Sequence, residues 1–571
     1  MSKQLRFSFP DQLKNFGSVL SKKEKFFLYL AVFILVGSIL TWAFRYYVAA
    51  TEEVPAIGGE YTEGIIGQPS YINPVLAPTN ETDLAITRLI FSSLMTYDSN
   101  GALINDITEN YRIEEDGKKY TFEIKKGIKW HDDTELTAED IAFTIEIIKN
   151  KLFNAPLVLR GDWQEVEVEV ENDYTISFKL KEASASFLNK TTFGILPQHI
   201  FKNITSDKFL LSEFNLKPVG SGPFVFTHYE QDDEGNIISY QLLANSNYHA
   251  GKPFLEKINF DFYSDKESLY EAYKKKEING LTALPYEEID NFSQRNDTNL
   301  HVLKTSQYFA TYFNQTKSVP LADVEVRKAL IHGTNRQEII DGFFMGYALP
   351  VFSPIIPEFG DFTTTQAEKY PFDPKKAEEL LENTGWKKQE DGTRKKDEGT
   401  LNIKLTVHAE YPSYTKTAES LKAQWEKIGV QVELSYLEDL AFKNAITPRE
   451  YQSVLYGQPY IGNDPDPFFF WHSSRKKNPG QNFALYENEE VDKLLSDARG
   501  NISLEERKSK YAEFENKLLN DAPALFICSP QFVYITNSKI KGNETAAIVN
   551  LSYRFTDINK WYIKTIRKKK K

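Results

Sequence analysis

The chain has 571 residues, 41% of them hydrophobic, with a formal net charge of −12 and a single cysteine. A chain of this length exceeds one small core, so we expect two or three lobes of roughly 150 residues each. The acidic balance argues against nucleic acid as the main partner, because phosphate binding requires a basic surface. The lone Cys528 excludes an intrachain disulfide and a cysteine-rich metal site.

Near the N-terminus, residues 26–44 (FFLYLAVFILVGSILTWAF) contain no charge. As a helix they would span about 28 Å, close to the hydrocarbon thickness of a bilayer. Arg45 alone follows them closely, whereas six basic residues precede them: Lys3, Arg6, Lys14, Lys22, Lys23 and Lys25. This asymmetry predicts a cytoplasmic N-terminus and an extracytoplasmic main body. Trp42, Tyr46 and Tyr47 would form an aromatic belt at the outer end.

We expect residues 26–48 to be a retained transmembrane anchor at the cell membrane, with residues 1–25 cytoplasmic and 49–59 a polar linker. A cleavable signal peptide is the alternative, because Val48-Ala49-Ala50 resembles a cleavage site, although its apolar core would be shorter. A lipoprotein signal would require a cysteine directly after the apolar run, and the sequence has none there.

Strand-like and helix-like patterns interleave along the rest of the chain. Alternating polar and apolar residues predict strands, apolar residues at helical spacing predict helices, and Thr137 is a candidate N-cap. The class is therefore α/β, with an antiparallel contribution near residues 110–200. The expected strands lie in 120–130 and 163–181, and the expected helices lie in 138–152 and 373–386. The segment 416–437 is expected to begin as a helix and to end as a strand.

The local motifs do not predict an enzyme. The eight histidines are dispersed, and the chain has no HExxH motif, GxSxG elbow or Walker loop. VGSGPF (219–224) is interpreted as a tight turn that leads into a strand, because a proline follows its glycines. His131-Asp132-Asp133 is interpreted as a turn before a capped helix. We predict no catalytic residue, no metal site and no cofactor.

Two further segments stand out. In the segment 464–467, Asp-Pro-Asp-Pro, each proline fixes its own φ and restricts the residue before it, so the turn is rigid. It could present a carboxylate beside aromatic walls to a cationic ligand, or form a turn over a buried phenylalanine cluster, and taken alone it favours the second. The basic tail, 564–571, is expected to be a solvated, disordered end, with contact to an anionic membrane as the alternative.

Several motifs in order resemble family 5 solute-binding proteins of ABC importers, the oligopeptide- and dipeptide-binding group. The resemblance covers roughly residues 60–563 and ends in DINKWYI. It is carried by FEIKKGIKWHDDTELTAEDIAFTIE (122–146), KPVGSGPF (217–224), ANSNYHAGKPFLEKI (244–258), YFNQTKSVPLADVEVRKALIHGTNRQEII (312–340), YPFDPKKAEELLENTGW (370–386) and the Asp-Pro-Asp-Pro segment.

The resemblance implies a bilobed, type II periplasmic-binding-protein-like fold with an extra α+β subdomain, preceded here by the membrane helix. It also implies a non-enzymatic monomer that closes about a hinge over a peptide, which pairs with strands beside the cleft. The ligand then passes to ABC permease subunits with cytoplasmic ATPases. The lobes map to about 60–97, 210–305 and 520–563 (lobe I), 98–209 (the subdomain) and 306–519 (lobe II).

The implied ligand contacts transfer less well. Such relatives commonly carry an aspartate before the Asp-Pro turn that pairs with the ligand's amino terminus, and here that position falls on Asn463 or Ile461. Asp464 and Asp466 are the nearest replacements, and with Asn463 they are predicted ligand contacts. The other candidates are Asn80, Glu81, Gln458, Tyr460, Trp471 and Asn482.

Other functions stay open. The same family resemblance also covers binders of nickel chelates, haem and sugars, and the missing carboxylate favours considering them. The permanent anchor would also suit a surface sensor or chaperone that is uncoupled from transport.

Overall fold

The computed structural model describes residues 20–282, 284–356, 362, 368–459 and 464–570. The chain forms two compact units. One combines Met1–Ile57 with Tyr562–Lys571, and the other contains Gly58–Trp561.

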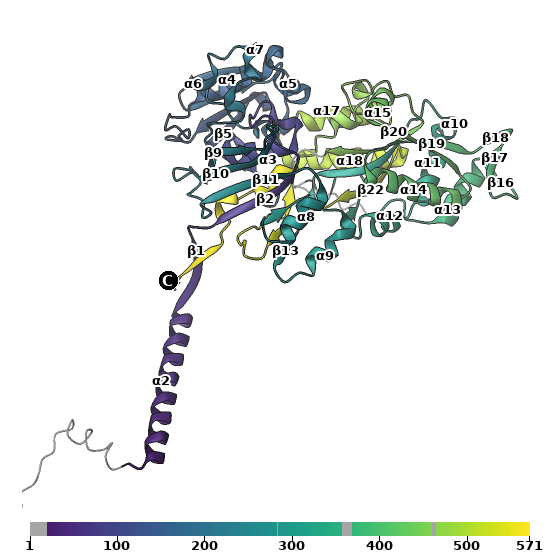
Figure 1. Cartoon of the computed structure of the whole chain (residues 1–571). Helices are drawn as coiled ribbons and strands as arrows, with labels where there is room; N and C mark the ends of the chain where they lie inside the picture. Colours follow the sequence, from purple (N-terminus) through teal and green to yellow (C-terminus); the bar gives the residue numbers. More distant parts are fainter. Residues whose placement is uncertain (1–19, 283, 357–361, 363–367, 460–463, 571) are drawn as a thin grey trace, which may run out of the picture. The chain divides into compact units, whose positions relative to one another are not determined.

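The smaller unit is built on helix α2 (Lys22–Ala50), which includes the expected apolar segment (Figure 1). Ser21 caps the helix, because its hydroxyl accepts from the Glu24 amide while the Glu24 carboxylate accepts from the Ser21 amide. None of its residues is buried. Among the described residues, α2 is the one helix long and apolar enough to cross a membrane.

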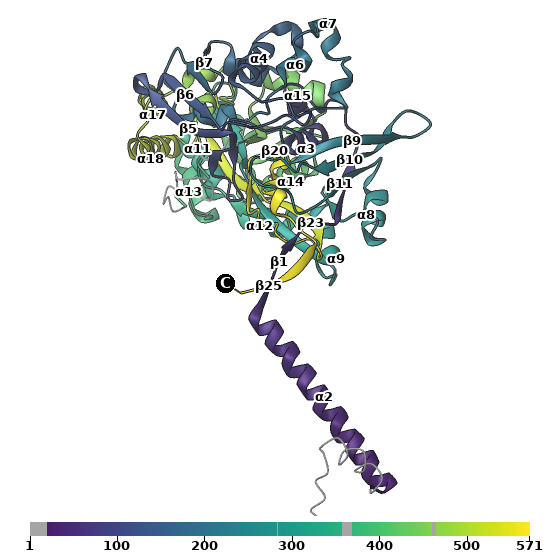
Figure 2. The ribbon, with the colours of Figure 1, turned by 90° about the vertical axis from the view of Figure 1, so that its left-hand side faces the viewer.

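The two chain ends meet in a ribbon. Strand β1 (Thr51–Ala56) pairs antiparallel with β25 (Lys564–Lys569), and the Lys570 amide donates to the Ala50 carbonyl at 3.0 Å (Figure 2). The expected linker is therefore largely a strand, and the interpretation of the basic tail as a disordered end is wrong for residues 564–569. No local pattern could reveal this pairing, because the two strands lie at opposite ends of the sequence.

The larger unit contains an eight-stranded mixed sheet. Its strands, in spatial order, are β24 (Ala547–Ile548), β13 (Thr298–Thr305), β23 (Phe532–Asn537), β12 (Gly280–Leu281), β2 (Glu60–Ile66), β11 (Lys257–Tyr263), β10 (Ile237–Ala244) and β9 (Phe224–Gln231). All of them fall within the ranges expected for lobe I. Helices α3 (Glu81–Ile90) and α8 (Lys266–Lys274) belong to the same part of the chain.

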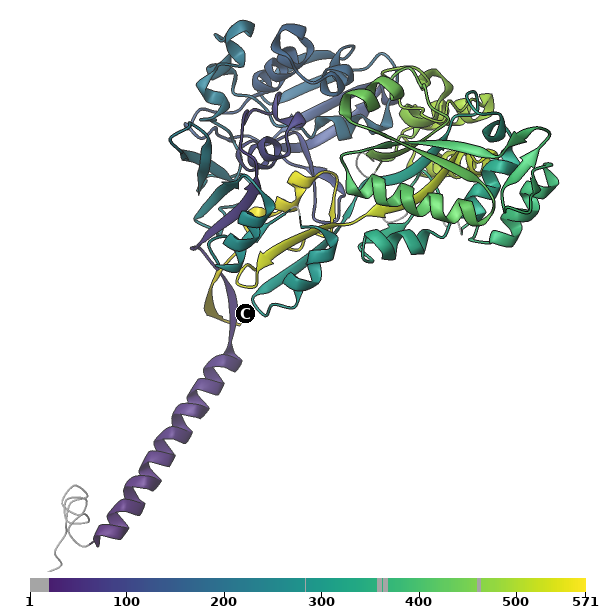
Figure 3. The same cartoon turned by 45° about the vertical axis from the view of Figure 1, so that its right-hand side comes forward.

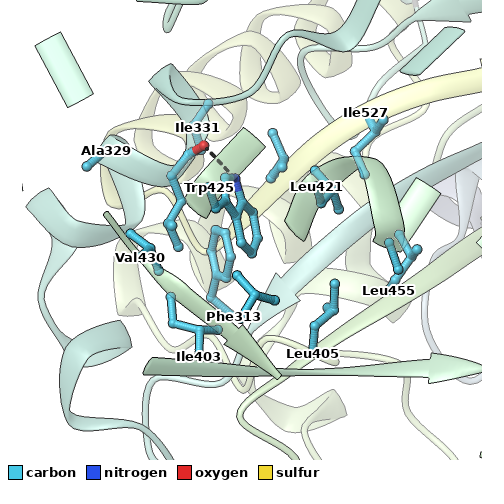
Figure 4. Packing of buried hydrophobic residues seen from close by; sticks show 14 of the residues in the cluster. Phe313, Ala329, Ile331, Ile403, Leu405, Leu421, Trp425, Val430, Leu455 and Ile527 are labelled. Carbon is cyan, nitrogen blue, oxygen red and sulfur yellow. Dashed lines mark hydrogen bonds between the residues drawn. The ribbon is translucent and has the colours of Figure 1, made fainter. Parts of the chain in front are cut away.

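A second, six-stranded sheet corresponds to lobe II. Its order is β15 (Ala348–Pro350), β22 (Ala524–Pro530), β14 (Gln307–Phe313), β21 (Ser453–Pro459), β19 (Asn402–His408) and β20 (Gln431–Leu437). The associated helices are α11 (Val324–His332), α12 (Arg336–Phe343), α13 (Pro374–Asn383), α14 (Pro412–Lys427), α15 (Asp439–Ile446), α17 (Glu489–Arg499) and α18 (Leu504–Asp521). One core cluster surrounds Trp425, whose indole nitrogen donates to the Leu330 carbonyl at 3.1 Å (Figure 4).

The chain crosses between these sheets twice. Ser306 alone separates β13 from β14, and Gln531 alone separates β22 from β23 (Figure 3). Thr305 links the two crossings, because its hydroxyl donates to the Pro530 carbonyl at 2.7 Å. The second crossing comes about ten residues later than the expected lobe boundary at 520, because the apolar pattern of β22 does not show which sheet it joins. The lobe boundaries themselves stay a prediction.

The expected subdomain contains a four-stranded antiparallel sheet of β5 (Thr108–Glu114), β6 (Lys119–Ile124), β8 (Thr175–Lys179) and β7 (Glu167–Asn172). The helix predicted after Thr137 is confirmed as α4 (Ala138–Lys149), and Thr137 and Asp140 form a capping box. The helix and strand predicted within 416–437 are confirmed as α14 and β20, separated by Gly429 at φ +89°, but α14 begins earlier than predicted, at Pro412.

The two turn motifs found in the sequence form one structure. The Gly220 amide donates to His131 Nδ1 at 3.2 Å, and His131 Nε2 lies 3.2 Å from the Gly222 carbonyl, which fixes the imidazole as the Nε2–H tautomer. Burial lowers the pKa of His131 to about 4, so the ring is neutral. The Gly222 amide donates to the Ile90 carbonyl at 2.8 Å. The histidine therefore fixes the glycine turn, and the Gly222 amide holds that turn against the end of α3.

A buried ionic cluster crosses the first sheet. Glu63 of β2 is fully buried and accepts from Arg554 Nε at 3.0 Å and from the Tyr534 hydroxyl at 2.9 Å. Tyr61 adds a third, short hydrogen bond to the same carboxylate. Because Glu63 and Arg554 come from opposite ends of the chain, this cluster joins β2 to the segment that follows β24.

Candidate ligand-binding cleft

A cleft of about 940 Å³ opens on the second sheet, and we call it the aromatic cleft. His408 ends β19 and Gly457 lies near the end of β21, and these two parallel strands run side by side. Ligands of α/β proteins commonly bind at the carboxyl ends of parallel strands. The rings that line the cleft are Phe309, His408, Tyr411, Tyr414, Phe442, Tyr456 and Phe483.

Tyr414 is the best-positioned of these rings. It stacks on Phe309 with ring centres 4.9 Å apart and planes 10° apart, and its hydroxyl accepts from the Gly457 amide at 3.1 Å. Burial raises the pKa of Tyr414 to about 12, so the phenol stays neutral. A Cβ on Gly457 would lie 2.9 Å from the Phe309 ring and 2.9 Å from the Tyr414 hydroxyl, so glycine is needed for this packing. The wall is thereby preorganised.

Charges on the cleft wall are uneven. Asp439 is the one acid among the described lining residues, and His408 Nε2 lies 2.7 Å from its carboxylate. Lys443 and Arg449 also line the cleft. Arg449 is buried, its Nη groups donate to the Ile446 and Gly480 carbonyls, and burial lowers its pKa. The wall therefore suits a ligand that carries a carboxylate.

Asn80 and Glu81, the predicted ligand contacts of the first lobe, differ in whether their side chains already have partners within the protein. The Asn80 side chain caps α3, because its oxygen accepts from the Thr82 and Asp83 amides at 2.9 and 3.2 Å. Glu81 is exposed, yet burial of its carboxyl among neighbouring atoms raises its pKa, and Arg554 opposes that shift. Glu81 is thus an accessible acid that makes no ion pair with the residues that the structure describes, and ligand contact through it stays a prediction.

The candidates on and after β21 are only partly described. The Gln458 backbone pairs with Tyr308 of β14, which places Gln458 at the end of a central strand. Tyr460 and Asn463 lie outside the residues that the structure describes. Trp471 and Asn482 are buried, and the Asn482 amide donates to the Tyr486 carbonyl at 2.8 Å. This geometry gives the last two a role in the core, and ligand contact through them is untested.

Both aspartates of the Asp-Pro-Asp-Pro turn have arginine partners. Asp464 lies 2.7 Å from Arg507 Nη2, and Asp466 lies 3.2 Å from Arg499 Nε. Ser186 of the subdomain donates to Asp466 at 2.9 Å. The turn therefore binds α17, α18 and the subdomain, which favours the structural interpretation, and its predicted ligand contacts remain untested.

Asp464 should make stability depend on pH. Burial raises the pKa of its carboxyl to about 6 against the opposing Arg507 charge, so the folded state holds this proton more tightly than the unfolded state. The resulting stabilisation is complete below about pH 3.8 and is lost as the pH rises through 6. Between pH 4 and 7, the free energy of unfolding of the wild type should fall by up to about 3 kcal/mol relative to that of the Asp464→Asn variant. Urea unfolding measures this difference, and a constant difference would refute the assignment.

The sequence did not identify the aromatic cleft. Its signal was present in HAEYPSY (408–414), where a histidine and two tyrosines follow a strand and begin a helix. Residues at such a junction face the carboxyl edge of a parallel sheet. What the sequence could not show is that Phe442 and Phe483 complete the same wall.

Two α/β lobes joined by two adjacent crossings, with a cleft at strand ends, define a bilobed binding protein of the type II class. A model of the bacterial extracellular solute-binding proteins, family 5, matches residues 102–480. The chain belongs to this family.

Three relatives show the range of similarity. The oligopeptide-binding protein AppA of Bacillus subtilis is 28% identical over 488 residues, covering 83% of this chain and 87% of the relative. Its structure with a nonapeptide matches with a TM-score of 0.68 and 26% identity, covering 89% and 99% of the two chains. The dipeptide-binding protein of Escherichia coli is 25% identical, covering 83% and 90%. NikZ of Campylobacter jejuni, solved with Ni(L-His), matches with a TM-score of 0.70 and 25% identity, covering 88% and 99%.

Proposed function

We propose that the protein is a membrane-anchored, extracytoplasmic receptor that captures peptides in the aromatic cleft and passes them to the permease of an ABC importer. The observation that carries the proposal is the aromatic cleft, a preorganised apolar wall at the carboxyl ends of two parallel strands. Relatives named for oligopeptide and dipeptide binding support the peptide ligand. The proposed role is binding, without catalysis.

The chemistry of the cleft suits peptides of varied sequence. Its volume of about 940 Å³ is at the upper end of ordinary ligand sites. Aromatic walls accept apolar side chains without strict shape requirements. Lys443 and Arg449 would attract a ligand carboxylate. We assign the ligand's amino group to Glu81, the exposed acid of the two predicted first-lobe contacts. Acetylated peptides should then bind more weakly than free ones, and equal affinities would remove Glu81 from the site.

Closure would proceed about the paired crossings at Ser306 and Gln531. Two short, adjacent connections allow rotation while they hold the two sheets in register. A peptide that contacts both lobes stabilises the closed state by its differential affinity. The protein would act as a monomer.

The anchor is part of the proposal. Helix α2 would be retained, with residues 1–25 in the cytoplasm, so that the receptor stays beside its permease. Intact-mass analysis of the membrane fraction should show the full chain. A soluble product that begins near Thr51 would instead identify α2 as a cleaved signal.

Native mass spectrometry of protein purified without denaturation tests the ligand. A mixture of co-purifying peptides is the expected result. A single defined small molecule would contradict the peptide assignment and favour the second candidate, a nickel chelate. That candidate is supported by the likeness to NikZ and by His408 in the cleft, because imidazole is a common nickel ligand.

Tyr414→Ala should weaken peptide binding about tenfold or more, because it removes a stacked ring and its hydrogen bond to Gly457. Calorimetry with a peptide identified by mass spectrometry measures the loss. Tyr436→Ala is the matched control, since Tyr436 is exposed on β20 and does not line the cleft. Equal affinities of the two variants would place the ligand elsewhere.

A further inference from the structure

The ribbon of β1 and β25 carries a dense set of positive charges on an otherwise acidic protein. Six basic residues lie on it or just before it, against two acids, Glu52 and Glu53. They are Arg45, Lys564, Arg567, Lys568, Lys569 and Lys570. All four of the lysines are exposed. Five of the six come from the C-terminal segment, which pairs back onto the chain directly after α2.

The register places Lys568, Lys569 and Lys570 beside the end of α2. Thr51 pairs with Lys569 and Glu52 with Lys568, while the Lys570 amide donates to Ala50. Ala50 lies about 9 Å along the helix axis beyond residue 44, the end of the apolar segment. The headgroup layer of a bilayer occupies this depth. These three charges are therefore within a Debye length of lipid headgroups, if α2 spans the membrane as proposed.

Arg567 fastens the strand in this position. Its Nη1 lies 2.9 Å from the Glu53 carboxylate, its Nε donates to the Thr51 hydroxyl at 3.0 Å, and Nη2 donates to the Val48 carbonyl at 3.2 Å. The last contact reaches into the final turn of α2. The lysines after Arg567 are thus held at the helix end by side-chain bonds as well as by the ladder.

We infer that Lys568, Lys569 and Lys570 form a docking surface for the headgroups of acidic phospholipids around the outer end of α2. The inference rests on the proposed retention of α2 as a membrane anchor. Each lysine close to an anionic surface strengthens binding about fivefold. Lipid contact would stabilise the paired ribbon, so that both ends of the chain are fixed at the membrane.

Lys564 provides a matched control within the same strand. It pairs with Ala56, five residues along the ribbon from Thr51, and therefore lies about 17 Å farther from α2. At this distance salt screens most of its attraction to the surface. The same substitution at Lys564 should have little effect on lipid binding.

The test uses the full chain in nanodiscs of phosphatidylcholine, with and without 30% phosphatidylglycerol. Amide hydrogen exchange of the 562–571 peptide should be at least about fivefold slower in the acidic nanodiscs, and 0.5 M salt should remove the difference. The Lys568→Gln/Lys569→Gln/Lys570→Gln variant should show equal exchange in both, whereas Lys564→Gln should keep the difference. Each variant is compared with itself in the two kinds of nanodisc. Any effect of a substitution on the stability of the ribbon is therefore present in both measurements and cancels.

Two outcomes overturn the inference: equal exchange in both nanodiscs for the wild type, or a lipid effect that survives the triple substitution. Neither outcome would contradict the proposed peptide-binding function. Failure of the proposed anchor is seen separately, because the intact mass of the native protein would then lack residues 1–50.

Discussion

Gly220→Ala is expected to lower the free energy of unfolding by more than about 4 kcal/mol. A Cβ at Gly220 would lie 1.8 Å from the Ile90 carbonyl oxygen and 2.6 Å from its carbon. Because these are backbone atoms at the end of α3, no side-chain rotation relieves the overlap. Separation of the turn from α3 would also break the hydrogen bond from the Gly222 amide to the Ile90 carbonyl. Urea unfolding of the full chain in detergent measures the change.

Gly342→Ala is the matched control for this substitution. Gly342 lies in α12, where an added Cβ meets nothing within 4 Å. Alanine there should raise the free energy of unfolding by about 0.5–1 kcal/mol through helix propensity. A Gly220→Ala protein as stable as Gly342→Ala would mean that the turn does not pack on α3.

Arg554→Ala is expected to lower the free energy of unfolding by about 3–5 kcal/mol, because it leaves the Glu63 carboxylate buried without a cation. Arg295→Ala is the comparison within the same lobe, since Arg295 pairs with Asp297 at 3.2 Å on the partly exposed surface. That pair should contribute less than about 1 kcal/mol. Similar losses from the two variants would show that burial does not distinguish them. Chemical unfolding of both proteins under one set of conditions makes the comparison.

Elements with strong local signals were predictable. The helices α4 and α14 combine apolar periodicity with a signal at one terminus: Thr137 marks the start of α4, and Gly429 marks the end of α14. The bilobed class followed from a series of different motifs whose order along the chain resembles that of family 5 solute-binding proteins. These features depend on residues that are close in sequence, where propensity and capping act.

The remaining features depend on long-range pairing. His131 and Gly220 were identified separately as turns, and only the fold brings them together. The aspartates of the Asp-Pro-Asp-Pro turn have partners in α17 and α18, which no local pattern assigns. The aromatic cleft likewise collects rings from several segments between residues 309 and 483. A single sequence shows such residues but not which of them meet.

Lys568, Lys569 and Lys570 follow Ala50 by more than 500 residues, so they are absent when α2 is synthesised. Lysines located directly after an anchor helix in the sequence would oppose its insertion with the N-terminus in the cytoplasm, because basic residues in short flanking segments determine orientation. Here the basic side chains that lie beside Ala50 are carried by residues that are synthesised after the whole binding domain. If α2 spans the membrane as proposed, its orientation is decided while Arg45 is the one basic residue close to its outer end. The other positive charges would reach that end only after the binding domain has been exported. A chain that stops before residue 564 would insert correctly and yet lack the second strand.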